Sequence, residues 1–433
     1  MTPHRPRIGE ALAHRARPRK PRRCTALLAV AALGLTAPTT ATATVTLGTS
    51  GPSPATRAEP DAPCAPATVP GVQMSEGLPT PPGHSPSTGV LRSLNLMIDF
   101  PDAHGEGSPR ARFDEFFPAT ADWYRTSSYG ALEYRAEAPV MEWLRMPRSF
   151  VEYGVDRGVS YEPGYRQLAK DIAEAADARV DFGAYDVVNV LVTPNAGPSA
   201  LDTVLSVTFA GIRDAPQADG VTLGHMSFVY SRQDDGSATA GLNAYRVLPH
   251  ENAHALGLPD LYTAQGGTRA GHWDIMSEDW GANNDFLAWH KRKLGWLGGK
   301  QVVCADGTGS SEHTISPLAR PDGTKLVYVP VSGRTGYAVE VRTQEGNDAA
   351  VCKPGVLVYW IDTGVSSGEG PVTVKDSKPH SDGCTTRPNV NAELTDAPFA
   401  PGERMADSTT GITVEVIGSD ASGNHRVRIT RPS

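Results

Sequence analysis

The segment from His250 to Asp260 constrains this chain more than any other feature. It reads His-Glu-Asn-Ala-His-Ala-Leu-Gly-Leu-Pro-Asp. Residues four apart stand above one another on one face of an α-helix, so His250 and His254 can direct ring nitrogens at a common point. Gly257 can then end the helix in a left-handed turn, which brings Asp260 back as a third donor. The segment therefore predicts a metal-binding helix followed by a tight reversal.

The residue types of this segment favour zinc and hydrolytic chemistry. Three protein ligands with one open position for water are typical of a catalytic zinc site. Glu251 lies beside the first histidine, where its carboxylate can take a proton from water without binding the metal. A bare His-Glu-x-x-His also occurs by chance on amphipathic helices, but Asp260 strengthens the zinc interpretation. We predict that His250, His254 and Asp260 are zinc ligands and that Glu251 is the general base.

Further segments extend the pattern beyond this helix. Gly271–Ser277 reads Gly-His-Trp-Asp-Ile-Met-Ser. Together with the metal-binding pattern it resembles the immune inhibitor A family of secreted zinc metallopeptidases, which are relatives of the metzincins. Leu94–Asp102, Trp123–Leu132 and Phe286–Trp296 are similar to other segments of that family. The resemblance covers about residues 91–299.

The resemblance implies an α+β fold with a metzincin-like zinc metallopeptidase domain, in which a twisted mixed sheet carries an active-site helix. It implies peptide hydrolysis, with extended substrate pairing to an edge strand above the zinc. Met276 would form the apolar floor under the metal, although a methionine alone is more often a core residue, since its side chain fills irregular gaps well. Asp260 is the third ligand expected in this family, where many metzincins have histidine. His225 and His272 could be further catalytic groups, but a structural role fits each better.

Pro249 departs from an ideal metal-binding helix. Its ring clashes with the carbonyl of Tyr245 if the helix extends upstream, so the helix is expected to begin or kink at Pro249. A proline as the first helical residue would preserve the ligand spacing. This residue favours one alternative, a secreted binding protein whose metallopeptidase-like domain is inactive. A zinc hydrolase acting on non-peptide amides is a further alternative.

The first 43 residues have the pattern of a secretory signal peptide. Residues 1–23 hold eight Lys or Arg side chains and one acidic residue, and Thr25–Ala37 is apolar and uncharged. Ala41–Ala43 is a plausible cleavage site. The apolar run is too short to span a bilayer, so a retained anchor is the less favoured alternative. We expect a secreted, extracellular monomer without stable membrane insertion.

Charge limits the partners of the exported chain. The full chain has a formal net charge of -8, and loss of residues 1–43 would make it about -15. Nucleic acid is therefore an unsuitable partner, because binding to phosphates needs a basic face. Extracellular proteins or peptides are the expected substrates. Calcium is a second candidate cofactor at acidic loops such as Asp99–Asp102, although their spacing matches no calcium-binding loop.

The cysteines predict disulfides. Cys24 leaves with the signal peptide, and four cysteines in an oxidising compartment allow three connectivities. Cys352 and Cys384 are the preferred pair because both lie in the C-terminal region, which leaves Cys64 to pair with Cys304. A less favoured alternative has Cys64 binding the zinc as a latency switch in a propeptide.

Composition divides the exported chain into three parts. Residues 44–90 are rich in Pro, Thr, Ala and Gly, and we interpret them as a linker or a short pro-segment. Residues 91–299 form the predicted zinc metallopeptidase domain, and residues 300–433 a β-sandwich-like C-terminal domain. Ordered structure is expected to begin near Leu91.

Within the predicted metallopeptidase domain, apolar runs at Leu94–Ile98 and Val187–Val192 indicate buried strands. Gln167–Ala178 has a helical rhythm of apolar residues. Residues 196–243 are rich in Gly, Ser and Asp and contain one further strand candidate, His225–Tyr230.

Beyond residue 300 the pattern becomes one of strands. Alternation at Tyr337–Arg342, Ile412–Val416 and Arg426–Ile429 predicts half-buried strands of an antiparallel sheet. Val356–Ile361 is continuously apolar, which suits a strand covered on both faces.

Overall fold

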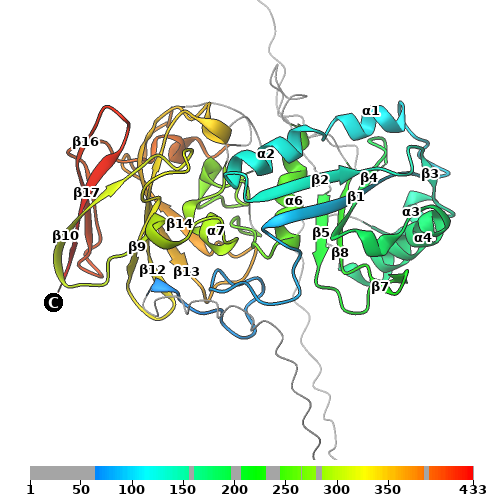
Figure 1. The fold of residues 1–433 in the computed structure, drawn as a ribbon, viewed down its shortest axis with the longest axis horizontal. Helices are drawn as coiled ribbons and strands as arrows, with labels where there is room; N and C mark the ends of the chain where they lie inside the picture. Colours follow the sequence, from blue (N-terminus) through cyan, green and yellow to red (C-terminus); the bar gives the residue numbers. More distant parts are fainter. Residues whose placement is uncertain are drawn as a thin grey trace, which may run out of the picture. The chain divides into compact units, whose positions relative to one another are not determined.

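The computed structural model describes residues 64–155, 160–196, 206–230, 244–264, 266–278, 285–384 and 390–432. The predicted signal peptide lies outside these ranges. Sheets and a few helices make this an α+β protein (Figure 1). One six-stranded mixed sheet with its helices and a two-stranded sheet precede residue 300, and two larger sheets follow it.

The first sheet has six strands in the order β2-β1-β4-β8-β5, with β3 also paired to β1. The strands are β1 (Gly89–Asp99), β2 (Leu132–Glu137), β3 (Leu144–Arg145), β4 (Val187–Val192), β5 (Ser206–Ala210) and β8 (His225–Val229). All pairs are parallel except β5 with β8, which is antiparallel. The expected strands at Leu94–Ile98, Val187–Val192 and His225–Tyr230 correspond to β1, β4 and β8, and β5 forms the edge.

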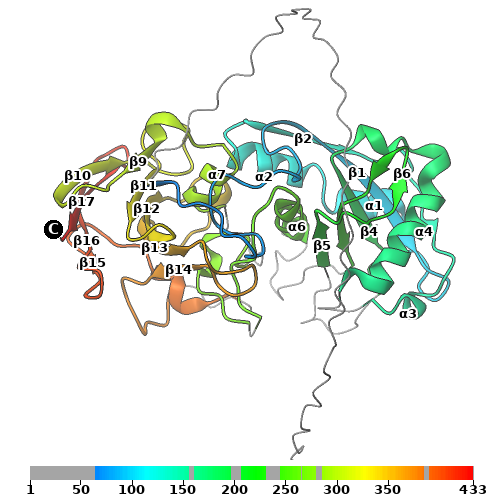
Figure 2. The same cartoon turned by 90° about the horizontal axis from the view of Figure 1, so that it is seen from below.

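Helices cover both faces of this sheet. Because side chains alternate along a strand, Leu94, Leu96 and Ile98 share a core with α4, whereas Leu91 and Met97 share another with α2, α6 and α7. Figure 2 shows α4 and α6 on opposite sides of the strands. The helices are α1 (Pro109–Asp114), α2 (Ala119–Ser127), α3 (Phe150–Tyr153), α4 (Arg166–Ala176), α6 (Val247–Ala255) and α7 (Ala288–Lys293). The helix predicted at Gln167–Ala178 is α4, and a short hairpin of β6 (Gln217–Ala218) and β7 (Val221–Thr222) lies between β5 and β8.

The C-terminal part contains two sheets packed face to face. The five-stranded sheet has the order β14-β13-β12-β11-β9 and the four-stranded sheet the order β10-β17-β16-β15. Val339 and Val358 contribute to the core that the two sheets share, whereas Ala338 and Tyr359 belong to the core that includes α6 and α7. The strands are β9 (Val302–Cys304), β10 (Gly309–Ile315), β11 (Leu326–Pro330), β12 (Thr335–Arg342), β13 (Gly355–Asp362), β14 (Val372–Lys375), β15 (Arg404–Ala406), β16 (Thr413–Ser419) and β17 (His425–Arg431). The sandwich therefore packs onto the rest of the protein through its larger sheet.

Strand β12 corrects one expectation. Its alternating pattern predicted a half-buried strand, but every residue from Gly336 to Arg342 is buried. The charged residues tolerate this because Arg342 lies 3.1 Å from both Glu340 Oε1 and Asp348 Oδ2. Burial of a charge is possible where an opposite charge compensates for lost hydration. β16 and β17 alternate as expected, and β13 is almost wholly buried.

The segment before β1 corrects a second expectation. Described structure begins at Cys64, which is 2% exposed, and not near Leu91. Residues 64–88, here called the arm, pack against α7 despite their few apolar side chains. Lys293 Nζ donates hydrogen bonds to the backbone carbonyls of Ser75 at 2.9 Å and Gly77 at 2.6 Å. Polar contacts to its backbone thus hold a segment that composition marked as a linker.

Both disulfides have the preferred connectivity. Cys64 is bonded to Cys304 and Cys352 to Cys384, with Cα–Cα distances of 5.6 Å and 6.0 Å. The first bond ties the arm to β9. Because the Cys64 sulfur is in a disulfide, the alternative in which it binds zinc is wrong for this structure.

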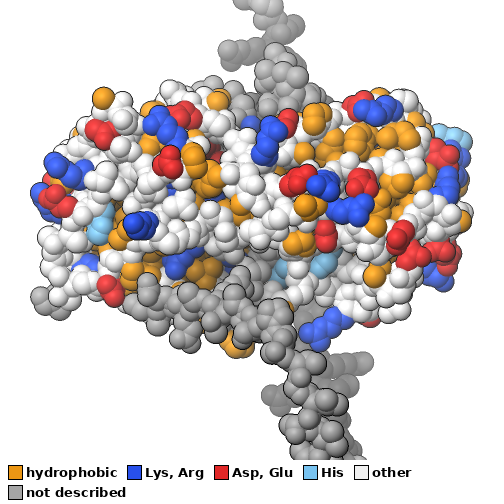
Figure 3. Space-filling view, in the orientation of Figure 1, with side chains coloured by type: hydrophobic (Ala, Val, Ile, Leu, Met, Phe, Trp, Pro, Cys, Tyr) orange, Lys and Arg blue, Asp and Glu red, His pale blue; other side chains and the backbone are white. Residues whose placement is uncertain are grey.

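The surface carries charges of both signs. On the face drawn in Figure 3, Lys and Arg side chains are interspersed with Asp and Glu. None of the described helices has the length and hydropathy needed to cross a membrane.

Candidate metal centre

Helix α6 carries both histidines of the pattern. His250 and His254 lie one turn apart and are each 7% exposed. The helix was expected to begin or kink at Pro249, but it begins two residues earlier, at Val247, directly after a 3-10 turn at Ala244–Arg246. Pro249 is the third helical residue, in the first turn, where backbone N–H groups have no acceptor within the helix, so a proline costs α6 no hydrogen bond of its own. Its carbonyl accepts a hydrogen bond from the Tyr124 hydroxyl at 2.8 Å.

The reversal after α6 follows from Gly257. This residue has φ 94°, which favours glycine. Its N–H donates to the His254 carbonyl at 2.9 Å, and the N–H of Leu258 donates to the Ala253 carbonyl at 3.0 Å. These two bonds form a Schellman motif, which satisfies the last carbonyls of the helix. The chain then turns back and brings Asp260 to the histidine face.

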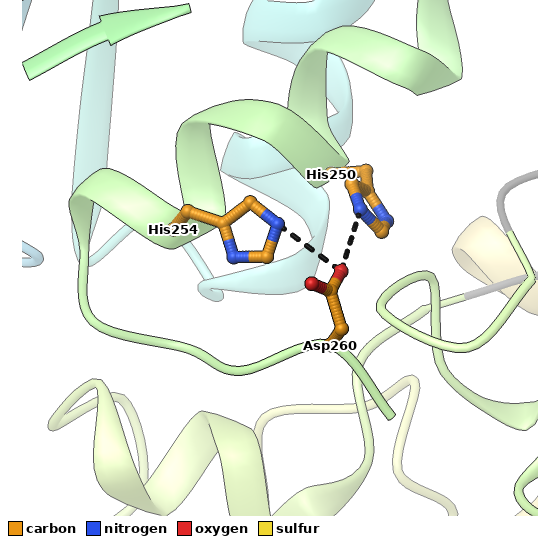
Figure 4. Close-up of side chains that lie close together, drawn as sticks. All are labelled: His250, His254 and Asp260. Atoms are coloured by element: carbon orange, nitrogen blue, oxygen red, sulfur yellow. Dashed lines mark ion pairs between the residues drawn. The ribbon is translucent and has the colours of Figure 1, made fainter. Parts of the chain in front are cut away.

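The three predicted ligands converge (Figure 4). Asp260 Oδ1 lies 3.3 Å from His250 Nε2 and 3.2 Å from His254 Nε2. Their donor atoms form the one group of three or more metal-ligand side chains found among the described residues. The sequence spacing thus correctly predicted that His250, His254 and Asp260 lie close together.

The other ring nitrogens orient the histidines. His250 Nδ1 lies 2.8 Å from the carbonyl oxygen of Ile275, and His254 Nδ1 lies 2.8 Å from that of Leu258. A carbonyl only accepts, so each Nδ1 carries a proton, and Nε2 is the nitrogen that each ring directs at Asp260. Two ring nitrogens and a carboxylate oxygen that face one point can bind a cation, and the mixed nitrogen and oxygen donors suit zinc.

The charges of the cluster depend on one another. Burial raises the pKa of Asp260, but the charge of His254 and the contacts with both rings outweigh burial and hold it well below its usual range. Burial lowers the pKa of His254, but the carboxylate of Asp260 more than offsets this and raises it. The cluster therefore stabilises a positive charge between the rings and the carboxylate.

Glu251 lies beside the cluster without joining it. It is 5% exposed, and its Oε2 accepts a hydrogen bond from the Thr208 hydroxyl at 2.8 Å. Burial raises the pKa of Glu251, partly opposed by His250 and His254. A carboxylate with a raised pKa next to three donors is suited to accepting and returning a proton.

A buried polar network joins α6 to the sheet. Asn252 Nδ2 donates to Asn189 Oδ1 on β4 at 2.7 Å and to Ser227 Oγ on β8 at 2.9 Å. Ser227 Oγ lies 2.8 Å from the hydroxyl of Thr208 on β5. Because Thr208 donates to Glu251, hydrogen bonds run without interruption from the sheet to the candidate base.

Thr208 and Asn252 were missed in the sequence. Ser-Val-Thr-Phe-Ala at Ser206–Ala210 has the β-branched and aromatic composition of a strand, which could have revealed β5. Asn252 occupies a variable position of the pattern, and nothing in the sequence indicates its contacts.

Met276 follows Ile275, whose carbonyl lies next to His250. It is fully buried, its N–H donates to Asp274 Oδ1 at 2.8 Å, and its carbonyl accepts from Leu261. The preceding residue, Ile275, is the one that orients His250. The segment thus supports the centre through its backbone.

Other candidate groups lie outside the centre. His225 Nε2 lies 2.8 Å from the Gly83 carbonyl oxygen. The His272 ring packs against Trp273, with their ring centroids 4.6 Å apart. In the acidic loop proposed for calcium, Asp99 Oδ1 forms an ion pair with Arg145 Nε at 2.6 Å. Asp102 Oδ1 accepts a hydrogen bond from the backbone of Phe150. Both carboxylates of that loop thus have protein partners.

Comparisons with known proteins do not assign the chain to a family. No family model matches it, and no curated protein matches it. The kinship with the immune inhibitor A family therefore stays a prediction that rests on the sequence segments.

Proposed function

We propose that this protein is a secreted zinc-dependent endopeptidase with a metzincin-like catalytic domain. One observation carries the proposal: His250, His254 and Asp260 converge while Glu251 stands beside them, buried and held by another partner. A donor set with a separate carboxylate is what metal-assisted hydrolysis needs. Kinship with the immune inhibitor A family and export through residues 1–43 are parts of the same proposal, and two disulfides support export.

Each residue has a defined role in this proposal. His250, His254 and Asp260 would hold the zinc, which when bound lowers the pKa of water and polarises a carbonyl. Glu251 accepts the proton of the attacking water and passes it to the leaving amine. Thr208 holds the carboxylate of Glu251 in place for both transfers.

The edge strand β5 suits extended peptides. It ends the strand order of the first sheet, all five of its residues are half-buried, and its Thr208 contacts the candidate base. A peptide that adds to a sheet edge is bound through its backbone, so many sequences can be accepted. This feature favours peptides over small amides as substrates.

The inactive-domain alternative loses its main support. Pro249 lies in the first turn of α6, where a proline is tolerated, and both histidines keep their spacing. An assay separates the two functions. The purified mature chain should cleave casein, lose this activity with a zinc chelator and regain it with added zinc, whereas an inactive domain would cleave nothing under any of these conditions.

A further inference from the structure

A loop of the C-terminal part holds the third donor of the metal centre. Residues 363–371 join β13 to β14. The backbone N–H of Asp260 donates to Ser367 Oγ at 2.8 Å, and the same hydroxyl donates to Asp260 Oδ2 at 3.2 Å. The hydroxyl accepts in one contact and donates in the other, so both bonds form together.

These contacts determine which oxygen faces the histidines. With Oδ2 of Asp260 bound to Ser367, Oδ1 is the atom that lies 3.3 Å from His250 Nε2 and 3.2 Å from His254 Nε2. Rotation of the carboxylate about its Cβ–Cγ bond would break the contact with Ser367. The hydroxyl thus fixes a single orientation of the carboxylate.

The backbone of the same loop fixes the segment after Asp260. Gly368 N–H donates to the Asp260 carbonyl at 3.2 Å, and the Gly368 carbonyl accepts from Ala264 N–H at 2.9 Å. The loop is itself anchored, because Ser367 N–H donates to the carbonyl of Gln73 in the arm at 3.0 Å. The arm is tied to β9 by the Cys64–Cys304 disulfide. The loop is therefore a fixed support for Asp260.

We infer that Ser367 is a positioning residue for the metal centre, so that the C-terminal sandwich takes part in metal binding. The inference rests on the proposed zinc-dependent function. Groups that orient metal ligands commonly change metal affinity 10- to 100-fold when they are removed. Loss of the Ser367 hydroxyl frees the Asp260 carboxylate to rotate, and we expect a loss of zinc affinity in that range.

The test measures zinc affinity and does not depend on activity. Zinc is titrated into the apo form of the full exported chain in competition with a chromophoric chelator. Ser367→Ala should bind zinc about 10- to 100-fold more weakly than the wild type. Ser366→Ala is the matched control, because Ser366 Oγ accepts from Gln73 N–H at 3.3 Å in the same loop. Ser367→Thr, which keeps a hydroxyl, should retain most of the zinc affinity of the wild type.

The outcomes distinguish the two proposals. A wild-type chain that binds no zinc would overturn the proposed function itself. Zinc binding by the wild type with equal affinity in Ser367→Ala would overturn only the role of Ser367. Equal losses in Ser366→Ala and Ser367→Ala would assign the effect to the loop as a whole and also overturn it. If Ser367→Ala does not fold, Ser367→Gly removes the same hydroxyl and has the same expected result.

Discussion

The Glu76 carboxylate lies 2.8 Å from Nε2 of His290, and neither side chain is exposed to solvent. Nδ1 of the same ring lies 2.7 Å from Oδ2 of Asp274. Asp274 in turn accepts the N–H of Met276 through Oδ1. One buried imidazole thus joins the arm, helix α7 and the segment Asp274–Met276, whose Ile275 carbonyl contacts His250.

Glu76→Gln should destabilise the protein strongly. The substitution keeps the shape of the side chain but removes one of the two carboxylates beside His290. Breaking a buried ion pair costs about 3–5 kcal/mol, and we expect about 3 kcal/mol because Asp274 remains. Urea unfolding measures the change as a lower midpoint. Glu174→Gln is the control, since Glu174 pairs with Lys170 at the surface, and equal midpoints for the two variants would contradict the prediction.

His290 should remain charged well above neutral pH. Burial lowers its pKa, but Asp274 and Glu76 outweigh burial and raise it from 6.5 to about 10. A pKa raised by folding stabilises the folded state below the unfolded value, so this contribution is complete below pH 6.5 and is lost as the pH rises toward 10. Imidazole NMR at about pH 8 should show a protonated ring, and the urea midpoint should fall across this window. A neutral ring at that pH would disprove the assignment.

The metal-ligand cluster could be predicted because its geometry is local. The helical repeat places His250 above His254, and Gly257 supplies the positive φ that returns Asp260. All of this lies within eleven consecutive residues. Local pattern therefore determines where the ligands meet.

The supporting residues could not be predicted, because their partners are distant in sequence. Thr208 reaches Glu251 from an edge strand, and Ser367 reaches Asp260 from the loop between β13 and β14. Composition also led us to predict a linker where the structure has the packed arm. The arm is held by backbone carbonyls that accept hydrogen bonds from Lys293, and a hydropathy pattern does not reveal such contacts. The pattern of β12 failed for a related reason, because its buried Arg342 is compensated by Asp348, outside the strand.

Glu251→Gln should keep zinc and abolish proteolysis. The amide has nearly the same shape but cannot accept the proton of the attacking water. Zinc should stay bound because the three donors do not include Glu251. Casein cleavage and zinc content by atomic absorption are measured on the same sample. Cleavage at the wild-type rate would show that another group is the base.

Asp260→Ala should lose the metal. Only the two imidazoles of α6 would remain, and two ligands do not hold a catalytic zinc that normally has three. Dialysed protein should contain much less than one zinc per chain, against about one in the wild type. Unchanged zinc content would place the third ligand elsewhere.

Thr208→Val should lower activity without loss of zinc. Valine matches the shape of threonine but removes the hydroxyl that donates to Glu251 at 2.8 Å. A hydrogen bond to a charged group is worth about 1.5–3 kcal/mol, so kcat/KM for a peptide should fall about tenfold or more. Thr208→Ser keeps the hydroxyl and should retain most of the activity.

Zinc content and the urea midpoint distinguish a loss of kcat/KM in Thr208→Val from a general loss of stability. Thr208 also contacts Ser227, so a structural role alone would lower stability and leave kcat/KM of the folded fraction unchanged. A role in holding Glu251 lowers kcat/KM at full zinc occupancy. Wild-type kcat/KM in Thr208→Val would mean that the Glu251 carboxylate keeps its position without this bond. The buried network from Asn252 to Thr208 would then support only the attachment of α6 to the sheet.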